Sequence, residues 1–197
     1  MANIETQKSL KISSIETLTP FYIPFFSIKI AEWERKKERL LSMVDWNNSS
    51  AIENDHFTDY HLNIKNGCPY REQFENVLSE ELQVFADHIK TNLVLKEIWA
   101  QRYHKEKHMV AHTHGSKGFS CVLYAEFDPS QHKATTFMAP FNNFINDDTL
   151  YFTPEVTEGT IVIFPSMLPH YAVPNTSSIP RTIFSLNMDT VVVQNND

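Results

Sequence analysis

The chain has 197 residues, which is enough for one domain with a sizeable core and short for two. Its 42% hydrophobic and 21% charged residues are typical of a globular protein, and a net charge of -7 disfavours a protein that coats nucleic acid through bulk electrostatics. No signal-peptide pattern or membrane-length apolar run is visible, and the distant Cys68 and Cys121 disfavour a disulfide framework. We expect a single domain over residues 1–197 in a reducing, cytoplasmic setting.

The first half of the chain predicts one strand followed by helices. Residues 1–17 are polar, and residues 19–30 are aromatic and β-branched, with prolines that suit an edge strand. Residues 31–44 combine an apolar stripe with a charged face and predict a helix, whereas residues 45–70 carry loop and turn chemistry. Residues 71–95 predict the clearest helix, because apolar side chains recur there at helical spacing. Residues 1–94 would therefore supply an N-terminal strand and supporting helices.

From Leu95 the pattern changes from helical to extended, and about eight short strands separated by turns follow. Helices followed by a run of strands predict a β-sandwich or barrel with helices on one side. Residues 95–193 would form this β core. The expected strands cover residues 95–103, 109–114, 119–127, 133–137, 149–152, 159–164, 170–173 and 181–193.

Three histidines in this β core are candidate metal ligands. His112 and His114 lie two residues apart on an expected strand, so their side chains would share one face and present two imidazoles side by side. A later strand ends at Pro165, and His170 follows after a turn. A third imidazole from a distant strand would complete a facial set of ligands and leave positions open for substrates. The alternative is that all three are ordinary surface histidines.

Arg181 begins the last strand, and its alternation puts Ile183, Ser185 and Asn187 on the same face. An Arg on a face that also carries Ser and Asn could bind a carboxylate through its planar guanidinium fork. The alternative is an Arg at a strand end that is solvated or paired with an acidic side chain.

The order of these residues resembles a known family. His-x-His, a third His and then an Arg eleven residues further on is similar to the iron(II)/2-oxoglutarate-dependent oxygenases of the double-stranded β-helix fold. The segments 112–124 (HTHGSKGFSCVLY) and 158–175 (EGTIVIFPSMLPHYAVPN) resemble a group found in marine bacteria and in tailed phages of cyanobacteria. The resemblance covers residues 95–189. It implies a jelly-roll (cupin-like) β core braced by the N-terminal helices, which makes the fold class all-β core with flanking helices.

The resemblance also implies roles for single residues. His112, His114 and His170 would bind Fe(II), and Arg181 would bind the C5-carboxylate of 2-oxoglutarate. Further contacts to this cosubstrate are expected from Gln101, Tyr103 and Asn187.

The implied enzyme would hydroxylate a substrate and release succinate and CO2. One residue departs from the wider superfamily, in which the second ligand is usually a carboxylate. Here that position is His114, which makes the site one charge more positive.

Two alternatives stay open. A cupin-type enzyme would bind a metal through the three histidines without 2-oxoglutarate. Gly159, Pro165 and His170 nearly reproduce the second cupin motif, but Met167 stands where Gly is usual, and the glutamate expected after the first histidine pair is absent. The other alternative is a β-sandwich binding module without enzymatic activity, in which the histidines are incidental.

The substrate is the least determined feature. A basic cluster flanks the expected site and would attract an anionic molecule, although such a cluster is also compatible with a solvated hairpin. Its residues are His104, Lys105, Lys107, His108 and Lys117. A small molecule, a peptide or a nucleotide is possible as substrate beside O2. A membrane partner is not expected, and a homodimer is left open.

Overall fold

The structure is a computed structural model that describes residues 22–53 and 56–191. The expectation for residues 1–17 therefore lies outside the described residues, as does the start of the strand predicted for residues 19–30. In the described part of the chain, no helix is long and apolar enough to cross a membrane. Both cysteines are free thiols, and Cys121 is buried, in agreement with the expectation of no disulfide framework.

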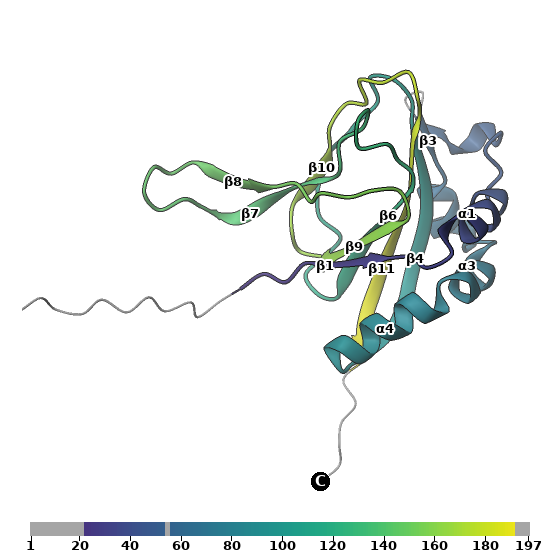
Figure 1. Cartoon of the computed structure of the whole chain (residues 1–197), viewed down its shortest axis with the longest axis horizontal. Coiled ribbons are helices and arrows are strands. Elements are labelled where there is room, and N and C mark those ends of the chain that lie inside the picture. The colour runs from purple at the N-terminus through teal and green to yellow at the C-terminus, as the bar shows by residue number, and fades with distance from the viewer. Residues whose placement is uncertain (1–21, 54–55, 192–197) are drawn as a thin grey trace, which may run out of the picture.

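The described residues form two antiparallel sheets that face each other without closing into a barrel (Figure 1). The larger sheet has seven strands in the order β1-β9-β6-β11-β4-β3-β2, and the smaller has four in the order β5-β10-β7-β8. The expected jelly roll is confirmed, and β1 is an edge strand as predicted. The strands are β1 (Phe26–Lys29), β2 (Ile52–Glu53), β3 (His56–Thr58), β4 (Asn92–Tyr103), β5 (Met109–His112), β6 (Phe119–Glu126), β7 (Thr136–Asn142), β8 (Thr149–Phe152), β9 (Thr160–Pro165), β10 (His170–Ala172) and β11 (Arg181–Val191).

Helices cover the outer face of the larger sheet, as Figure 1 shows. They are α1 (Trp33–Ser42), α2 (Tyr60–Asn66), α3 (Arg71–Val77) and α4 (Ser79–Ile89), with a short 3-10 helix at Ser49–Ala51. Leu40, Phe74 and Phe85 from the helices join Leu123 and Phe184 of the sheet in one buried cluster. This apolar contact braces the sheet from outside, in agreement with the predicted supporting helices.

A second buried cluster fills the space between the two sheets. Tyr103, Tyr124 and Ile183 come from the larger sheet, and Phe137 and Ala172 come from the smaller one. The larger sheet is therefore covered on both faces, which explains the continuous apolar runs of β6 and β9.

Two predictions about the helical half are wrong. The single helix expected over 71–95 is broken at Leu78, whose φ of -108° and ψ of 13° separate α3 from α4, and β4 already begins at Asn92. The predicted loop 45–70 contains α2, together with β2 and β3. α2 buries none of its side chains, and its sequence has no apolar stripe from which a helix could be predicted.

Several strand boundaries also differ from the predicted ones. Strand 109–114 stops at His112, and strand 133–137 instead runs over Thr136–Asn142 as β7. The strand expected over 181–193 is described as β11 up to Val191, and residues 149–152 form β8 as predicted. Strand ends are set by tertiary contacts that a local pattern does not contain.

Side chains from the helices cover the part of the β4 edge that β3 leaves unpaired. Asp59 accepts a hydrogen bond from the Ala100 amide at 2.8 Å, and Arg71 donates to the Leu95 carbonyl at 2.7 Å. Asn63 of α2 donates to the Ile98 carbonyl at 3.1 Å. These bonds hold α2 against the strand that forms one wall of the site described next.

Candidate metal centre

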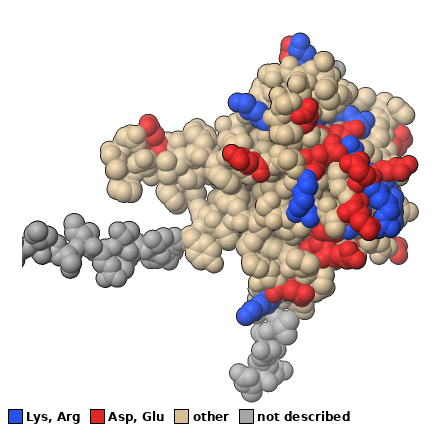
Figure 2. All heavy atoms as spheres, viewed as in Figure 1, with Lys and Arg blue, Asp and Glu red and all other residues tan. Residues whose placement is uncertain are grey.

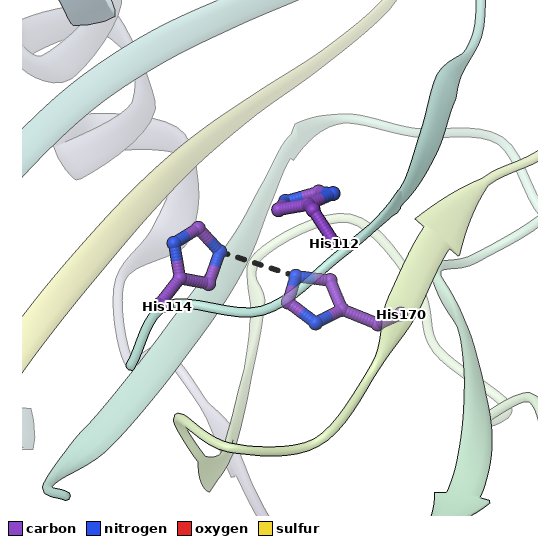
Figure 3. A group of neighbouring side chains, drawn as sticks. All are labelled: His112, His114 and His170. Atoms are coloured by element: carbon purple, nitrogen blue, oxygen red, sulfur yellow. Dashed lines mark hydrogen bonds between the residues drawn. The ribbon is translucent and has the colours of Figure 1, made fainter. Parts of the chain in front are cut away.

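Three imidazoles converge between the two sheets (Figure 3). His112 ends β5, His170 begins β10, and the two are direct cross-strand partners. Their ring centroids lie 4.4 Å apart, and the ring of His114 lies 4.9 Å from His112 and 5.0 Å from His170. One nitrogen from each ring lies within 4.8 Å of the others, so the three side chains can bind a single metal ion.

His114 reaches this position from a loop, which corrects the prediction that it shares a strand face with His112. The strand stops at His112, and the His114 amide donates to the Ser166 carbonyl at 2.9 Å. Gly115 then takes a φ of +116°, which is open to glycine and strained for other residues. The chain therefore turns toward the Pro165–Pro169 loop, and this turn brings the third ring to the other two.

The hydrogen bonds of the rings identify the nitrogen that is available to a metal. Nδ1 of His112 contacts the Val110 carbonyl at 2.8 Å, and Nδ1 of His170 contacts the Leu168 carbonyl at 2.9 Å. A carbonyl only accepts, so both Nδ1 atoms carry the proton and both Nε2 atoms present a lone pair. A backbone carbonyl on the far nitrogen is the usual arrangement for a metal-binding histidine.

The remaining close contact also fits a metal ion. Nε2 of His114 lies 3.2 Å from Nε2 of His170. Because Nε2 of His170 presents a lone pair, the contact requires either a proton on Nε2 of His114 or a cation between the two nitrogens. A divalent ion bound by both nitrogens satisfies it, so the donor set fits a metal such as Fe(II).

Burial keeps two of the three imidazoles neutral. The pKa of His114 is lowered to about 3, mainly by burial and in smaller part by the neighbouring rings of His170 and His112. Burial also lowers the pKa of His170 to about 4, although the bond to the Leu168 carbonyl acts in the opposite direction. Neutral imidazole is the form that binds metals, so these two rings are ready to act as ligands at neutral pH.

A cavity of about 300 Å³ adjoins the three histidines. Its opposite wall comes from β4 and β11 and presents polar side chains of Gln101, Tyr103 and Ser185. None of the described residues that line it is Asp, Glu, Lys or Arg. The remaining lining residues are Thr58, Tyr60, His61, Trp99, Met109, Thr113, Val122, Thr135, Tyr171, Ala172 and Ile183. An anion in this cavity would be met by hydroxyl and amide groups.

Arg181 lies behind this wall. Its guanidinium is buried, donates to the carbonyls of Lys133 at 2.6 Å and Val173 at 3.1 Å, and lies 4.8 Å from the centre of the Tyr103 ring. The other side of the Tyr103 ring stacks on His56 at 5.6 Å. Burial lowers the pKa of Arg181, but an Arg keeps its charge in proteins. Arg181 is therefore a buried cation one side chain away from the cavity, and its predicted contact with a carboxylate stays a prediction.

Asn187 lies in a buried polar network that sequence reasoning missed. Its amide donates to Glu97, and its side-chain oxygen accepts from Ser120 at 2.8 Å. Ser120 in turn contacts Ser166 at 2.9 Å, and the Ser166 carbonyl accepts from His114 as described above. The network thus links the larger sheet to the loop between two metal ligands. The predicted contact of Asn187 with a cosubstrate stays a prediction.

Trp99 and the basic cluster complete the surroundings of the site. The Trp99 ring lies 5.4 Å from His114 and 5.0 Å from Tyr60, and both aromatic side chains line the cavity. The period-two pattern that predicted Gln101 and Tyr103 also includes Trp99, so this signal was present in the sequence. The predicted basic residues His104, Lys105, Lys107, His108 and Lys117 do not line the cavity, and Lys117 lies 3.6 Å from Asp189.

The fold and the three histidines define a double-stranded β-helix protein with a site for one metal ion. Residues 97–187, which contain all three histidines, match the family described as "Putative 2OG-Fe(II) oxygenase". The β core thus matches the 2OG-Fe(II) oxygenase family, which is a family of enzymes and implies Fe(II) and 2-oxoglutarate as cofactors. The resemblance expected from the sequence is thereby confirmed.

Solved structures of this family share the fold at low sequence identity. EctD from S. alaskensis, solved with 2-oxoglutarate and 5-hydroxyectoine, has a TM-score of 0.60 and 10% identity over 85% of this chain and 72% of its own. Viral collagen prolyl hydroxylase from Paramecium Bursaria Chlorella virus-1 has a TM-score of 0.56 and 11% identity over 85% of this chain and 96% of its own.

The carbocyclase SnoK from nogalamycin biosynthesis has a TM-score of 0.60 and 11% identity over 84% of this chain and 80% of its own. A search of curated protein sequences finds no match. At such identities the likeness concerns the fold alone. The narrower resemblance to proteins of marine bacteria and of phages stays a prediction.

Proposed function

We propose that the protein is an Fe(II)- and 2-oxoglutarate-dependent dioxygenase that hydroxylates its substrate and releases succinate and CO2. The observation that carries this proposal is the convergence of His112, His114 and His170 beside a closed polar wall, within a segment that matches the oxygenase family. Fe(II), when bound, would supply the activation of O2 that oxidises 2-oxoglutarate and substrate. The protein supplies the ligands, the orientation and the shielded cavity.

The three histidines would hold Fe(II) through their Nε2 atoms and leave the other positions for 2-oxoglutarate and O2. Three neutral ligands keep the full positive charge of the ion, whereas a carboxylate ligand would remove one unit of it. A dianionic cosubstrate compensates this charge more strongly here than in a site with His114 replaced by Asp. The three-histidine site therefore favours chelation of a dicarboxylate.

Recognition of the far carboxylate of 2-oxoglutarate would fall to the wall opposite the histidines. Gln101, Tyr103 and Ser185 offer hydrogen-bond donors, and the buried charge of Arg181 lies behind the Tyr103 ring. The absence of acidic side chains among the described lining residues supports this assignment, since none of them would repel the carboxylate. Asn187 contributes indirectly in this proposal, through the network that carries the His114 loop.

The substrate would enter from the side of Trp99 and Tyr60, and an anionic small molecule, peptide or nucleotide fits the basic cluster on the loop before β5. The exposed residues of this cluster are His104, Lys105 and His108 before β5 and Lys117 after it. A cytoplasmic setting, in a cell or in an infected host cell, is part of the proposal.

The test is turnover of 2-oxoglutarate by protein purified without oxygen and loaded with Fe(II). Wild-type protein should form succinate and consume O2, and the Arg181→Ala variant should form none while still binding Fe(II). Equal turnover of O2 in both proteins, without succinate, would favour the cupin-type alternative. Absence of stoichiometric metal in the wild type, unchanged in His112→Ala, would favour the binding module and contradict the proposal.

A further inference from the structure

The hairpin formed by β7 and β8 projects from the body of the molecule as an arm (Figure 1). The two strands pair from Phe137↔Phe152 to Asn142↔Thr149, and the connecting turn is closed by bonds among its own Asn and Asp residues. The base of the arm packs on the core, where Phe25 contacts Phe137 and Phe152. An isolated hairpin is marginally stable in water, so a partner that covers the tip of the arm would stabilise it.

The arm exposes large apolar side chains and almost no charge. Phe144 is 97% exposed and Ile145 82%, and four more large side chains along the arm are between 40% and 60% exposed. These four are Phe141, Leu150, Tyr151 and Phe152. Residues 136–153 include no Lys, Arg or Glu, and their only charged residues are Asp147 and Asp148 in the turn. Figure 2 shows the arm as a nearly uncharged projection.

The outer strand of the arm is also an open edge. β8 is the last strand of the smaller sheet, and among the described residues it pairs only with β7. Natural edge strands are usually protected by Lys, Pro or a bulge. The β8 sequence Thr149-Leu150-Tyr151-Phe152 holds neither Lys nor Pro, and the irregularity in its pairing, between Met138 and Asn142, places the extra residues on β7. The arm therefore presents an apolar surface and a row of backbone groups side by side.

We propose that the arm of one copy pairs with the arm of a second copy, β8 to β8 in antiparallel register, to form a twofold dimer. In this arrangement the unpaired backbone N–H and C=O groups of one β8 pair with those of the other β8. This is the self-complementary contact of a twofold interface. The pairing joins two four-stranded sheets, and each of them carries His112 and His170 of its own metal centre.

Charge and area favour a second copy as the occupant. Each chain carries a net charge of -7, so two copies repel except where the surface is uncharged, as it is on the arm. At 150–250 Å² for a large aromatic side chain, the six exposed side chains present roughly 600–800 Å² on each arm. Complete coverage of both arms would bury roughly 1,200–1,600 Å², which is the upper limit of this contact and reaches the range of specific, stable interfaces.

Sedimentation velocity of the full chain over a hundredfold concentration range tests the dimer. Wild-type protein should sediment with twice the chain mass of 22.9 kDa and dissociate on dilution. The double variant Phe144→Asp/Ile145→Asp should raise the dissociation constant at least tenfold, and Tyr151→Lys on the edge strand should do the same. The control is Val84→Asp, since Val84 is 60% exposed on α4 and lies outside the arm.

Cross-linking tests the register without weakening the interface. A Tyr151→Cys variant should oxidise to a disulfide-linked dimer, whereas Val84→Cys should form no disulfide-linked dimer under the same conditions. A wild type that is monomeric at the highest concentration overturns the proposal. A dimer that the arm variants leave unchanged and that Tyr151→Cys fails to cross-link overturns it too. Neither readout depends on metal binding or on turnover, so the dimer and the proposed oxygenase function fail separately.

Discussion

The two walls of the cavity are built in different ways. The histidine wall comes from β5, β10 and the loop after β5, and its three rings point at one another with their Nε2 atoms available. The opposite wall comes from the continuous strands β4 and β11, and its one nearby cation, Arg181, is turned toward backbone carbonyls behind Tyr103. The metal half of the site is thus assembled by loops and strand ends, whereas the cosubstrate half is part of the main sheet.

This difference has consequences for how each half responds to change. Removing a ligand from the histidine wall should abolish metal binding through the loss of one nitrogen donor, although the buried His170 ring also packs against Phe137 and Phe164. Changing the opposite wall should affect both 2-oxoglutarate binding and stability, since Arg181 also holds two loops together.

The largest effect is expected from the histidine wall. His170→Ala removes one of three ligands and should weaken binding of Fe(II) or Co(II) at least a hundredfold, while the thermal midpoint of the metal-free protein changes by only a few degrees. Titration with Co(II), followed by its visible absorption, measures this. His108→Ala is the matched control, because His108 is exposed and lies outside the cavity. Stoichiometric, unweakened Co(II) binding by His170→Ala would remove this residue from the site.

A change at Arg181, behind the opposite wall, should lower both the stability of the fold and the affinity for 2-oxoglutarate. Arg181→Ala leaves the Lys133 and Val173 carbonyls without their donor and should lower the free energy of unfolding by about 2–4 kcal/mol. It should also weaken 2-oxoglutarate binding at least a hundredfold without changing Co(II) affinity. Arg181→Lys keeps the charge and should bind 2-oxoglutarate about tenfold more weakly than the wild type. Wild-type affinity for 2-oxoglutarate in Arg181→Ala, measured by calorimetry, would separate this residue from the cosubstrate.

Tyr103 should separate the contribution of the hydroxyl from that of the ring. Tyr103→Phe keeps the ring that contacts Arg181 and His56 and removes only the hydroxyl of this cavity-lining residue. We expect 2-oxoglutarate affinity to fall by about tenfold and stability to change by less than about 1 kcal/mol. Tyr22→Phe is the control, since Tyr22 is exposed. A loss of stability without a loss of affinity would assign Tyr103 to packing alone.

Weakening the polar network that links the two walls should have an intermediate effect on metal affinity. Ser166→Ala removes the contact with Ser120 and frees the loop that holds His114. We expect Co(II) affinity to fall by about tenfold, in the range known for groups that orient metal ligands, with an altered absorption spectrum of the bound ion. Ser42→Ala on α1 is the control. An unchanged spectrum and affinity would mean that the loop is held by its backbone bonds alone.

The smallest effect concerns the helical brace of the larger sheet. Burial would raise the pKa of Glu158, but bonds from Lys37, Trp33 and the Phe127 amide outweigh it and place the pKa below the ordinary 4.5. Its stabilisation is therefore complete above pH 4.5 and is lost as the pH falls through the lowered value. Because Glu158 is partly exposed, we expect less than about 1 kcal/mol. Urea unfolding of Glu158→Gln should show a flatter pH dependence between about pH 5 and 3.

Much of this arrangement could be predicted from the sequence, and the misses have physical causes. Period-two alternation placed Gln101 and Tyr103 on one face, and the structure brings both to the cavity. The same rule was wrong for His114, because the strand ends early and a bond to the Ser166 carbonyl redirects the chain. Contacts between distant segments decide such turns, and no local pattern contains them.

In the arm and in the helical half, too, local sequence patterns did not predict where elements end. The strand predicted over 133–137 lies too early in the chain compared with β7, since the register with β8 depends on pairing across a turn. The break at Leu78 lies inside a sequence with continuous helical spacing, and only the packing of α3 and α4 on the sheet requires it. The sequence indicated which elements exist more reliably than where they end.

The most direct test of the proposed iron site is an anaerobic titration of the metal-free protein with Fe(II) and then with 2-oxoglutarate. Wild-type protein should bind one Fe(II) per chain and develop a visible charge-transfer band when 2-oxoglutarate chelates the metal. His170→Ala should show neither, and Arg181→Ala should bind Fe(II) but need far more 2-oxoglutarate for the band. A wild type that binds no Fe(II), or that binds it and gives no band at saturating 2-oxoglutarate, would contradict the proposed oxygenase.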